Sequence, residues 1–298
     1  LRQCQDKAAL VWRWQHPTRH HSNGRDFTNP DTAVSLMATL GLLSPEFPAN
    51  SLEENLAAMS RAGGIGVQFD LLCAMGDTFP AEFRPEEVEA VKVGFVHHGL
   101  ALSALSGTYN MIDPNPFKRE AGARALDRLI AAASGFGTKV VTLCTGSRDP
   151  ESMWRRHPDS DSPQAWADLL VSVERAVRTA EAHGISLGVE TEVGNSVNTV
   201  KKARALLDTI ASPNLKIIMD GANIFQKGEL PRMREKLDEA FELLGADIVL
   251  AHAKDLDRDG EAGHVAAGLG KLDYPYYLKL LAQSGYDGAI ILHALKPE

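Results

Sequence analysis

The 298-residue sequence has few cysteines, no excess of positive charge and no long apolar run. Its three cysteines, Cys4, Cys73 and Cys144, form no CxxC pair, so we expect reduced thiols rather than a disulfide framework. The net charge of −8 and the isoelectric point near 5.7 disfavour a nucleic-acid-binding scaffold. No apolar run approaches the roughly 18 residues of a membrane span, and the first residues lack a signal-peptide core. We therefore expect a cytoplasmic protein that binds neither nucleic acid nor membrane.

Two nucleotide-binding motifs are also missing. No GxGxxG follows the first expected strand and no GxxxxGK[ST] occurs anywhere, which disfavours dinucleotide-binding and P-loop folds. The length suits two average domains or one α/β barrel, and the 44% of hydrophobic residues is ordinary for a globular protein. Residues 1–30 are polar and rich in histidine, so we assign them to an N-terminal extension and residues 31–298 to one domain.

From about residue 34, short apolar runs alternate with segments of helical periodicity. The clearest helix is 162–183, which has Ser162 and Pro163 at its start and Gly184 at its end. Eight runs are typical of strands: 34–42, 65–69, 101–105, 139–144, 186–190, 216–220, 248–252 and 289–293. Eight strands alternating with helices predict an α/β fold of the closed (β/α)₈ TIM-barrel type.

The sequence ends about five residues after the eighth run, so the final helix of such a barrel is expected to be missing. An uncovered barrel face would expose an apolar patch, which soluble proteins avoid. We expect Leu10, Val11 and Trp14 of the extension, or a subunit of a homo-oligomer, to cover this face.

Four side chains that commonly bind metals stand at the ends of successive apolar runs. They are Glu190, Asp220, His252 and His293, spaced by roughly 30 to 40 residues, about one strand and one helix each. The carboxyl ends of parallel strands meet on one face of a barrel, where the active site lies. Two carboxylates and two imidazoles gathered there predict a site for one divalent ion such as Mn, Zn, Mg or Co.

The stretch from about 52 to 295 resembles the xylose isomerase-like TIM-barrel superfamily of sugar isomerases, epimerases and related lyases. The motifs that carry the resemblance are LGVE at 187–190, IIMDGAN at 217–223, LAHAKD at 250–255 and GHVAAGLG at 263–270. The resemblance implies that Glu190, Asp220 and His252 bind one divalent ion. This sequence departs from the family pattern at two positions: His293 replaces the usual second glutamate, and Asn223 replaces a histidine that many sugar epimerases carry.

The DNA-repair endonuclease branch of the superfamily uses further histidines after the second and third strands. Residues 68–70 and 106–108 contain none, so a three-metal nuclease site cannot be assembled. His264, in the loop after the seventh strand, is then either a substrate contact or an ordinary loop residue.

Other polar and aromatic residues are expected at the mouth of the barrel. Glu192 either supports the metal ligands or faces solvent. Lys254 either stabilises a substrate oxyanion or pairs with Asp255 or Glu192. Long loops on this face usually shape the substrate pocket, which adds the following candidates for substrate binding: Asn223, Tyr109, Arg148, Trp154 and His157. For Trp154 the alternative is a role as an anchor of its loop.

Together these residues and the resemblance predict a metal-dependent isomerase or epimerase that acts on a small keto-sugar, sugar or inosose through an enediolate. Glu190 is the expected base, and His293, Glu192 or Lys254 the second acid/base group. One alternative is a lyase or dehydratase that expels a β-leaving group from the same enolate. Another is a non-catalytic barrel that binds sugar.

Overall fold

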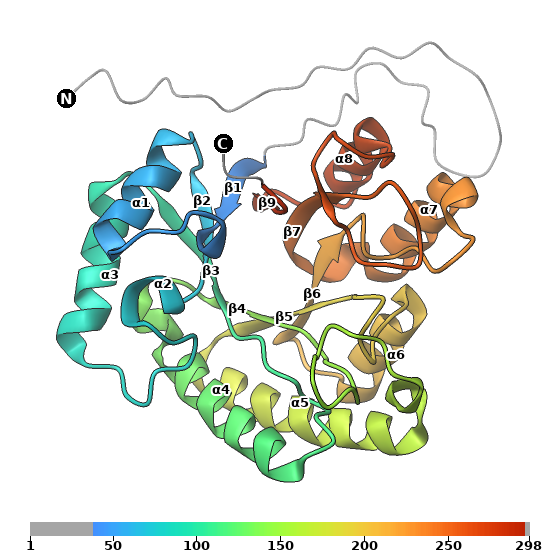
Figure 1. Ribbon diagram of the computed structural model, residues 1–298, viewed down its shortest axis with the longest axis horizontal. Coiled ribbons are helices and arrows are strands. Elements are labelled where there is room, and N and C mark those ends of the chain that lie inside the picture. The colour runs from blue at the N-terminus through green and yellow to red at the C-terminus, as the bar shows by residue number, and fades with distance from the viewer. Residues whose placement is uncertain (1–37, 296–298) are drawn as a thin grey trace.

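The computed structural model describes residues 38–295, and its eight parallel strands form a closed ring with helices around the outside (Figure 1). The strands pair in the order β6-β5-β4-β3-β2-β1-β9-β7, and the β6–β7 pair closes the ring. A short strand, β8, pairs antiparallel with the end of β7. The strands are β1 Thr39–Leu43, β2 Gly66–Phe69, β3 Ala101–Ser106, β4 Val140–Leu143, β5 Ser186–Glu190, β6 Leu215–Asp220, β7 Ile248–Asp255, β8 Val265–Ala266 and β9 Ala289–Leu292.

Helices connect the strands and cover the outside of the ring. They are α1 Leu52–Arg61, α2 Leu72–Met75, α3 Pro85–His97, α4 Pro116–Phe136, α5 Pro163–His183, α6 Val200–Ile210, α7 Met233–Leu244 and α8 Tyr274–Gln283. Four 3-10 helices lie in the connections: η1 Ser44–Glu46, η2 Pro158–Asp161, η3 Leu230–Arg232 and η4 Gly245–Asp247. Within residues 38–295, no helix is both long enough and apolar enough to span a bilayer. The TIM-barrel prediction is confirmed.

Helix α5 shows how local sequence sets the boundaries of an element. The Ser162 hydroxyl accepts a hydrogen bond from the Ala165 N–H at 3.1 Å, and Pro163 occupies the first turn. At the other end Gly184 has a φ of 63°, the left-handed conformation that glycine adopts without steric cost. The predicted helix over 162–183 is confirmed.

Alternation along each strand separates two layers of side chains. In β2, Val67 and Phe69 belong to the large apolar core between the ring and the helices, whereas Gln68 is the residue between them. A second, smaller apolar cluster contains Ala104, Ile218, Leu250 and Ile291, which come from β3, β6, β7 and β9. Asp220 and His252 stand two positions after Ile218 and Leu250, so they face the same side of the ring as the small cluster and lie beyond it at the strand ends.

All eight predicted strands are present in the described residues. The first spans Thr39–Leu43, and residues 34–37 of the predicted run lie outside the described residues. Among the described residues no helix follows β9. The extension over 1–30, and with it Leu10, Val11 and Trp14, lies outside the described residues, so the covering role of these side chains stays a prediction.

Candidate metal centre and active site

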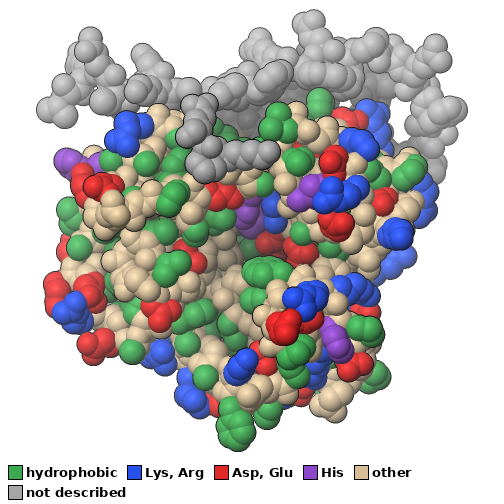
Figure 2. Space-filling view, viewed as in Figure 1, with side chains coloured by type: hydrophobic (Ala, Val, Ile, Leu, Met, Phe, Trp, Pro, Cys, Tyr) green, Lys and Arg blue, Asp and Glu red, His purple; other side chains and the backbone are tan. Residues whose placement is uncertain are grey.

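Three of the four predicted metal ligands come together at the ends of adjacent strands. Glu190 ends β5, Asp220 ends β6 directly opposite His252 of β7, and all three side chains are buried. One donor atom from each lies within 4.8 Å of the other two. Figure 2 shows a hollow near the middle of the viewed face, with histidine and acidic side chains in it.

Two buried atoms of this triad lack hydrogen-bond partners among the described residues. They are Oδ2 of Asp220 and Nδ1 of His252, and the latter lies 3.4 Å from Oε1 of Glu190. A buried polar atom without a partner costs free energy, which a bound cation would offset. Two carboxylates and one imidazole are also suitable donors for zinc, manganese or cobalt. The triad therefore fits a divalent ion.

Lys254 lies against the same carboxylates. Its Nζ is 3.1 Å from Oε1 of Glu190 and 3.1 Å from Oδ2 of Asp220, the second contact being an ion pair without hydrogen-bond geometry. Burial opposes the charge on the amine, but Glu190, Asp220 and Glu192 together raise the pKa of Lys254. The alternative in which Lys254 pairs with Asp255 is wrong, because the Asp255 carboxylate binds backbone N–H groups instead.

The two carboxylates that share this cation differ in acidity. Burial opposes ionisation of Glu190, yet Lys254 and His252 hold its pKa well below the usual value. Burial raises the pKa of Asp220, and the neighbouring Glu190 charge adds to the effect although Lys254 opposes it. Glu190 is therefore the carboxylate that ionises first.

Asn223 and Glu192 form the next part of the cluster. The Asn223 amide nitrogen donates to Oε1 of Glu190 at 2.7 Å and to Oε2 of Glu192 at 3.2 Å, while its oxygen accepts from the Gly263 N–H. Glu192 is buried, which excludes the alternative of a solvated side chain. Burial, with a contribution from the Glu190 charge, raises the pKa of Glu192 to about 7.

His293 is adjacent to the triad but is not part of its close donor set. Its ring packs against His252 with centroids 4.2 Å apart and the planes tilted by 38°, and its Nε2 is buried without a hydrogen-bond partner among the described residues. Both carboxylate oxygens of Glu46 accept backbone N–H groups of Ala294 and Leu295, which holds the segment after His293. Burial, His252 and Lys254 lower the pKa of His293 well below 6.5. The ring is therefore neutral around pH 7.

Two residues at this site were not singled out from sequence. The Gln68 oxygen lies 2.8 Å from Nε2 of His252, and the Cys144 thiol lies 3.9 Å from Oε2 of Glu190. Burial raises the pKa of Cys144 well above 9, so the thiol is protonated. Both stand at or next to the end of a predicted strand, the same signal that identified the triad. They were missed because glutamine and an isolated cysteine carry little chemical information in a sequence.

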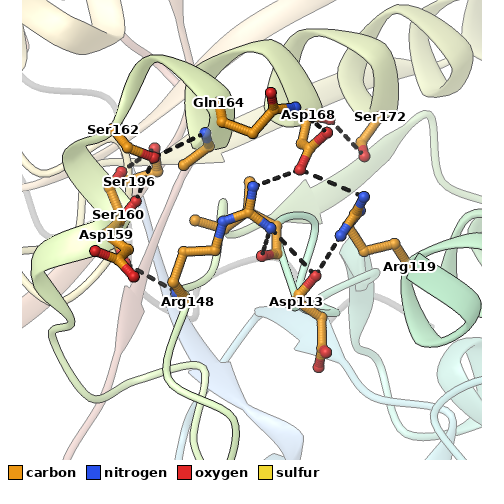
Figure 3. A network of polar contacts seen from close by, with 12 residues as sticks. Asp113, Arg119, Arg148, Asp159, Ser160, Ser162, Gln164, Asp168, Ser172 and Ser196 are labelled. Atoms are coloured by element: carbon orange, nitrogen blue, oxygen red, sulfur yellow. Dashed lines mark hydrogen bonds and ion pairs between the residues drawn. The ribbon is translucent and has the colours of Figure 1, made fainter. Parts of the chain in front are cut away.

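The loop between β4 and α5 is fixed by polar contacts on the outside of the barrel (Figure 3). Arg148 binds the Asp168 carboxylate and donates to the Ile112 carbonyl at 2.9 Å, and Arg119 binds the same carboxylate. These contacts occupy the Arg148 guanidinium, which was expected to bind substrate. Arg148 is therefore a structural anchor, and we leave it out of the proposed substrate site.

Tyr109 was also expected at the rim, but its ring packs beneath α4. A Cβ placed on Gly122 of that helix would come within 2.2 Å of the Tyr109 ring. The backbone turns after β3 and directs the side chain into the layer between the ring and the helices, where Tyr109 contacts the apolar core. These contacts do not favour a place at the substrate rim, and a role for Tyr109 in substrate binding stays a prediction.

Three further loop residues were expected to bind substrate: His264, His157 and Trp154. The two histidines form hydrogen bonds within their own loops, and Trp154 is exposed. His264 contacts Asp257 through Nε2 at 2.6 Å, and this hydrogen bond raises the pKa of His264. His157 accepts the Asp159 N–H at the start of η2. Trp154 is 53% exposed, and its carbonyl packs against Gly194 in the loop after β5. Trp154 alone of these three presents a free aromatic surface, and a role for it in substrate binding stays a prediction.

The chain belongs to the xylose isomerase-like TIM-barrel family, whose model matches residues 56–297. A ketose 3-epimerase from Arthrobacter globiformis is 23% identical over 254 residues, which cover 83% of this chain and 79% of that protein.

Two solved structures illustrate the likeness in fold. A 3-keto-D-glucoside 4-epimerase from E. coli superposes with a TM-score of 0.64 at 19% identity, over 85% of this chain and 90% of the other. An L-ribulose 3-epimerase superposes with a TM-score of 0.66 at 19% identity, over 86% and 80% of the two chains. At these identities the likeness shows the fold alone.

Proposed function

We propose that this protein is a divalent-metal-dependent isomerase or epimerase of a small keto-sugar or inosose. The observation that carries the proposal is the convergence of Glu190, Asp220 and His252 at the carboxyl ends of three adjacent barrel strands, where two of their buried donor atoms lack hydrogen-bond partners among the described residues. The names of the similar proteins, which include ketose and keto-glucoside epimerases, support a carbohydrate substrate. Homo-oligomerisation and a cytoplasmic location stay predictions from sequence.

A bound divalent ion would polarise a substrate carbonyl and lower the pKa of the adjacent C–H group. Glu190 is ionised and buried, so its carboxylate is suited to accept that proton. Lys254 carries a positive charge beside Glu190 and would stabilise negative charge that develops on a substrate oxygen. The Asn223 amide donates hydrogen bonds to both Glu190 and Glu192 and so holds the two carboxyl groups next to each other.

The second proton-transfer group is one of two residues. Glu192 shares Asn223 with Glu190, and His293 packs against His252. Because Lys254 is held in its charged form between two carboxylates, it is the weakest of the three candidates for accepting a proton. Loss of reprotonation with retained proton abstraction, in Glu192→Gln or in His293→Asn, would identify the group.

The test follows exchange of the α-proton. Metal-depleted protein is reconstituted with Mn²⁺, Zn²⁺, Mg²⁺ or Co²⁺ and incubated in D₂O with a panel of ketoses and inososes, and NMR measures deuterium incorporation. We expect exchange with at least one substrate, its loss on chelation, and its loss in Glu190→Gln with partial retention of metal, since an amide oxygen still coordinates. The exposed Glu89→Gln is the matched control and should exchange normally. Tight sugar binding with no exchange under any metal would instead indicate a non-catalytic binding barrel.

A lyase or dehydratase is the second candidate. It is favoured by His293, a neutral imidazole at the strand end where the family usually carries a second proton-transferring glutamate. If neither His293 nor Glu192 returns a proton to the enolate, the enolate can expel a β-leaving group. Products that have lost water or another group from the β-carbon would establish this activity, whereas products that differ only in configuration or carbonyl position would exclude it.

A further inference from the structure

Gln68 links the triad to the opposite part of the barrel wall. It stands in β2, which is separated from β7 in the ring by β1 and β9. Its side chain is buried, with 6% exposure, and its amide oxygen lies 2.8 Å from Nε2 of His252. The contact therefore spans the interior of the barrel rather than joining neighbouring strands.

The chemistry of this contact determines where the His252 proton lies. An amide oxygen only accepts hydrogen bonds, so Nε2 of His252 must carry the hydrogen. In the neutral ring the other nitrogen, Nδ1, then has a free lone pair. This is the atom that lacks a partner and lies 3.4 Å from Oε1 of Glu190.

The other end of the Gln68 amide faces two hydroxyl groups. Its Nε2 group donates to the Ser106 hydroxyl at 3.3 Å and to the Thr142 hydroxyl at 3.4 Å, and both residues are buried. Ser106 ends β3 and Thr142 lies in β4, so two neighbouring strands contact the amide nitrogen. With its nitrogen on these two hydroxyls, the Gln68 amide presents its oxygen to His252.

We infer that Gln68 is a positioning residue that sets the tautomer of His252 and so presents Nδ1 to a divalent cation. The inference rests on the metal site of the proposed function but does not depend on which sugar is the substrate. Hydrogen-bond partners of this kind fix the ring orientation of metal-binding histidines, and losing one weakens metal binding by about 10- to 100-fold.

The first test reads the tautomer directly in metal-free protein. Protein labelled with ¹⁵N-histidine is treated with chelator, and the His252 resonances are identified by their absence in His252→Asn. We expect the ¹⁵N shifts of a ring protonated at Nε2 and bare at Nδ1. A ring protonated at Nδ1 and bare at Nε2 would overturn the inference, because the amide would then face His252 with its nitrogen.

The second test measures affinity for Mn²⁺ and Zn²⁺ by chelator competition. Gln68→Met keeps the length of the side chain but removes the acceptor, and we expect about 10- to 100-fold weaker binding. Gln68→Glu keeps an acceptor for the Nε2 hydrogen and should bind within a few-fold of wild type. Gln226→Met is the control, because Gln226 is a partly buried glutamine whose amide binds the Asn198 carbonyl rather than His252. Its affinity should not change.

The outcomes separate this inference from the proposed function. Unchanged affinity in a folded Gln68→Met variant, checked by circular dichroism, would refute the role of Gln68. Wild-type protein with no affinity for either ion would refute the metal centre itself. Metal binding that depends on Gln68 in a protein inactive toward every sugar would support the inference and refute only the proposed reaction.

Discussion

Replacing Asp255 by asparagine tests how the loop after β7 is held in place. Asp255 is buried, and each of its carboxylate oxygens accepts two backbone N–H groups. Oδ1 binds Leu256 at 2.8 Å and Leu272 at 2.9 Å, and Oδ2 binds Gly268 at 3.1 Å and Gly270 at 2.9 Å. A single side chain therefore closes both ends of the loop that carries His264.

The magnitude follows from the number of N–H groups that lose their acceptor. Asparagine keeps one oxygen but places an NH₂ group where the other stood, so two donors are left without a partner. The N–H groups of Leu256 and Leu272 are buried at Oδ1, whereas those of Gly268 and Gly270 at Oδ2 are only part-buried. At about 1 to 3 kcal/mol for each buried donor, and less for a part-buried one, the free energy of unfolding should fall by about 1 to 6 kcal/mol. That is a large part of the roughly 5 to 15 kcal/mol typical of a folded domain.

The assay is urea denaturation followed by circular dichroism, combined with limited proteolysis of the native protein. If the loop opens locally before the barrel unfolds, the loss appears as cleavage within residues 256–272. The control is Asp257→Asn in the same loop, whose side chain is 54% exposed and should leave the denaturation midpoint nearly unchanged. A fall of less than about 1 kcal/mol in Asp255→Asn, with no new cleavage, would refute this reasoning.

Three further predictions concern the site and its loops. Lys254→Met removes the cation between two buried carboxylates and should lower the free energy of unfolding of metal-free protein by about 3 to 5 kcal/mol. Adding Mn²⁺ should restore the lost stability. Equal denaturation midpoints for the metal-free variant and the metal-free wild type would contradict this prediction. Burial raises the pKa of Glu192 from 4.5 to about 7, so folding favours the protonated carboxyl group. The free energy of unfolding that this preference adds is fully present below pH 4.5 and is lost as the pH rises through 7. In metal-free protein the loss should reach about 3 kcal/mol by pH 8 and be absent in Glu192→Gln, as urea titrations at several pH values would show. Gly194→Ala would place a Cβ within 2.3 Å of the Trp154 carbonyl and should lower the melting temperature, whereas Gly135→Ala on helix α4 meets nothing closer than 3.4 Å and should stabilise by about 0.5 to 1 kcal/mol. Similar melting temperatures for the two glycine variants would contradict the prediction, because they would show that the loops around Gly194 and Trp154 move apart without cost.

The sequence alone predicted the ring of strands and four candidate metal ligands at its end, three of which lie close together in the structure. Buried parallel strands are short apolar runs, and a polar residue that ends such a run must lie at the carboxyl edge of the sheet. Glu190, Asp220 and His252 could therefore be identified before their distances were known. Helix α5 was predictable for a similar reason, since Ser162 and Gly184 act on the backbone next to them.

Only the tertiary structure decided which partner each polar side chain takes. Lys254 lies between Glu190 and Asp220 rather than beside its neighbour Asp255, and Arg148 binds Asp168 of a helix instead of a substrate site. Gln68 reaches His252, 184 positions away, across the inside of the barrel. Spacing along the chain sets the face of an element on which a residue lies. The contacts of long side chains depend instead on how the strands close into a ring, because closure brings together residues whose separation in sequence carries no information about their distance.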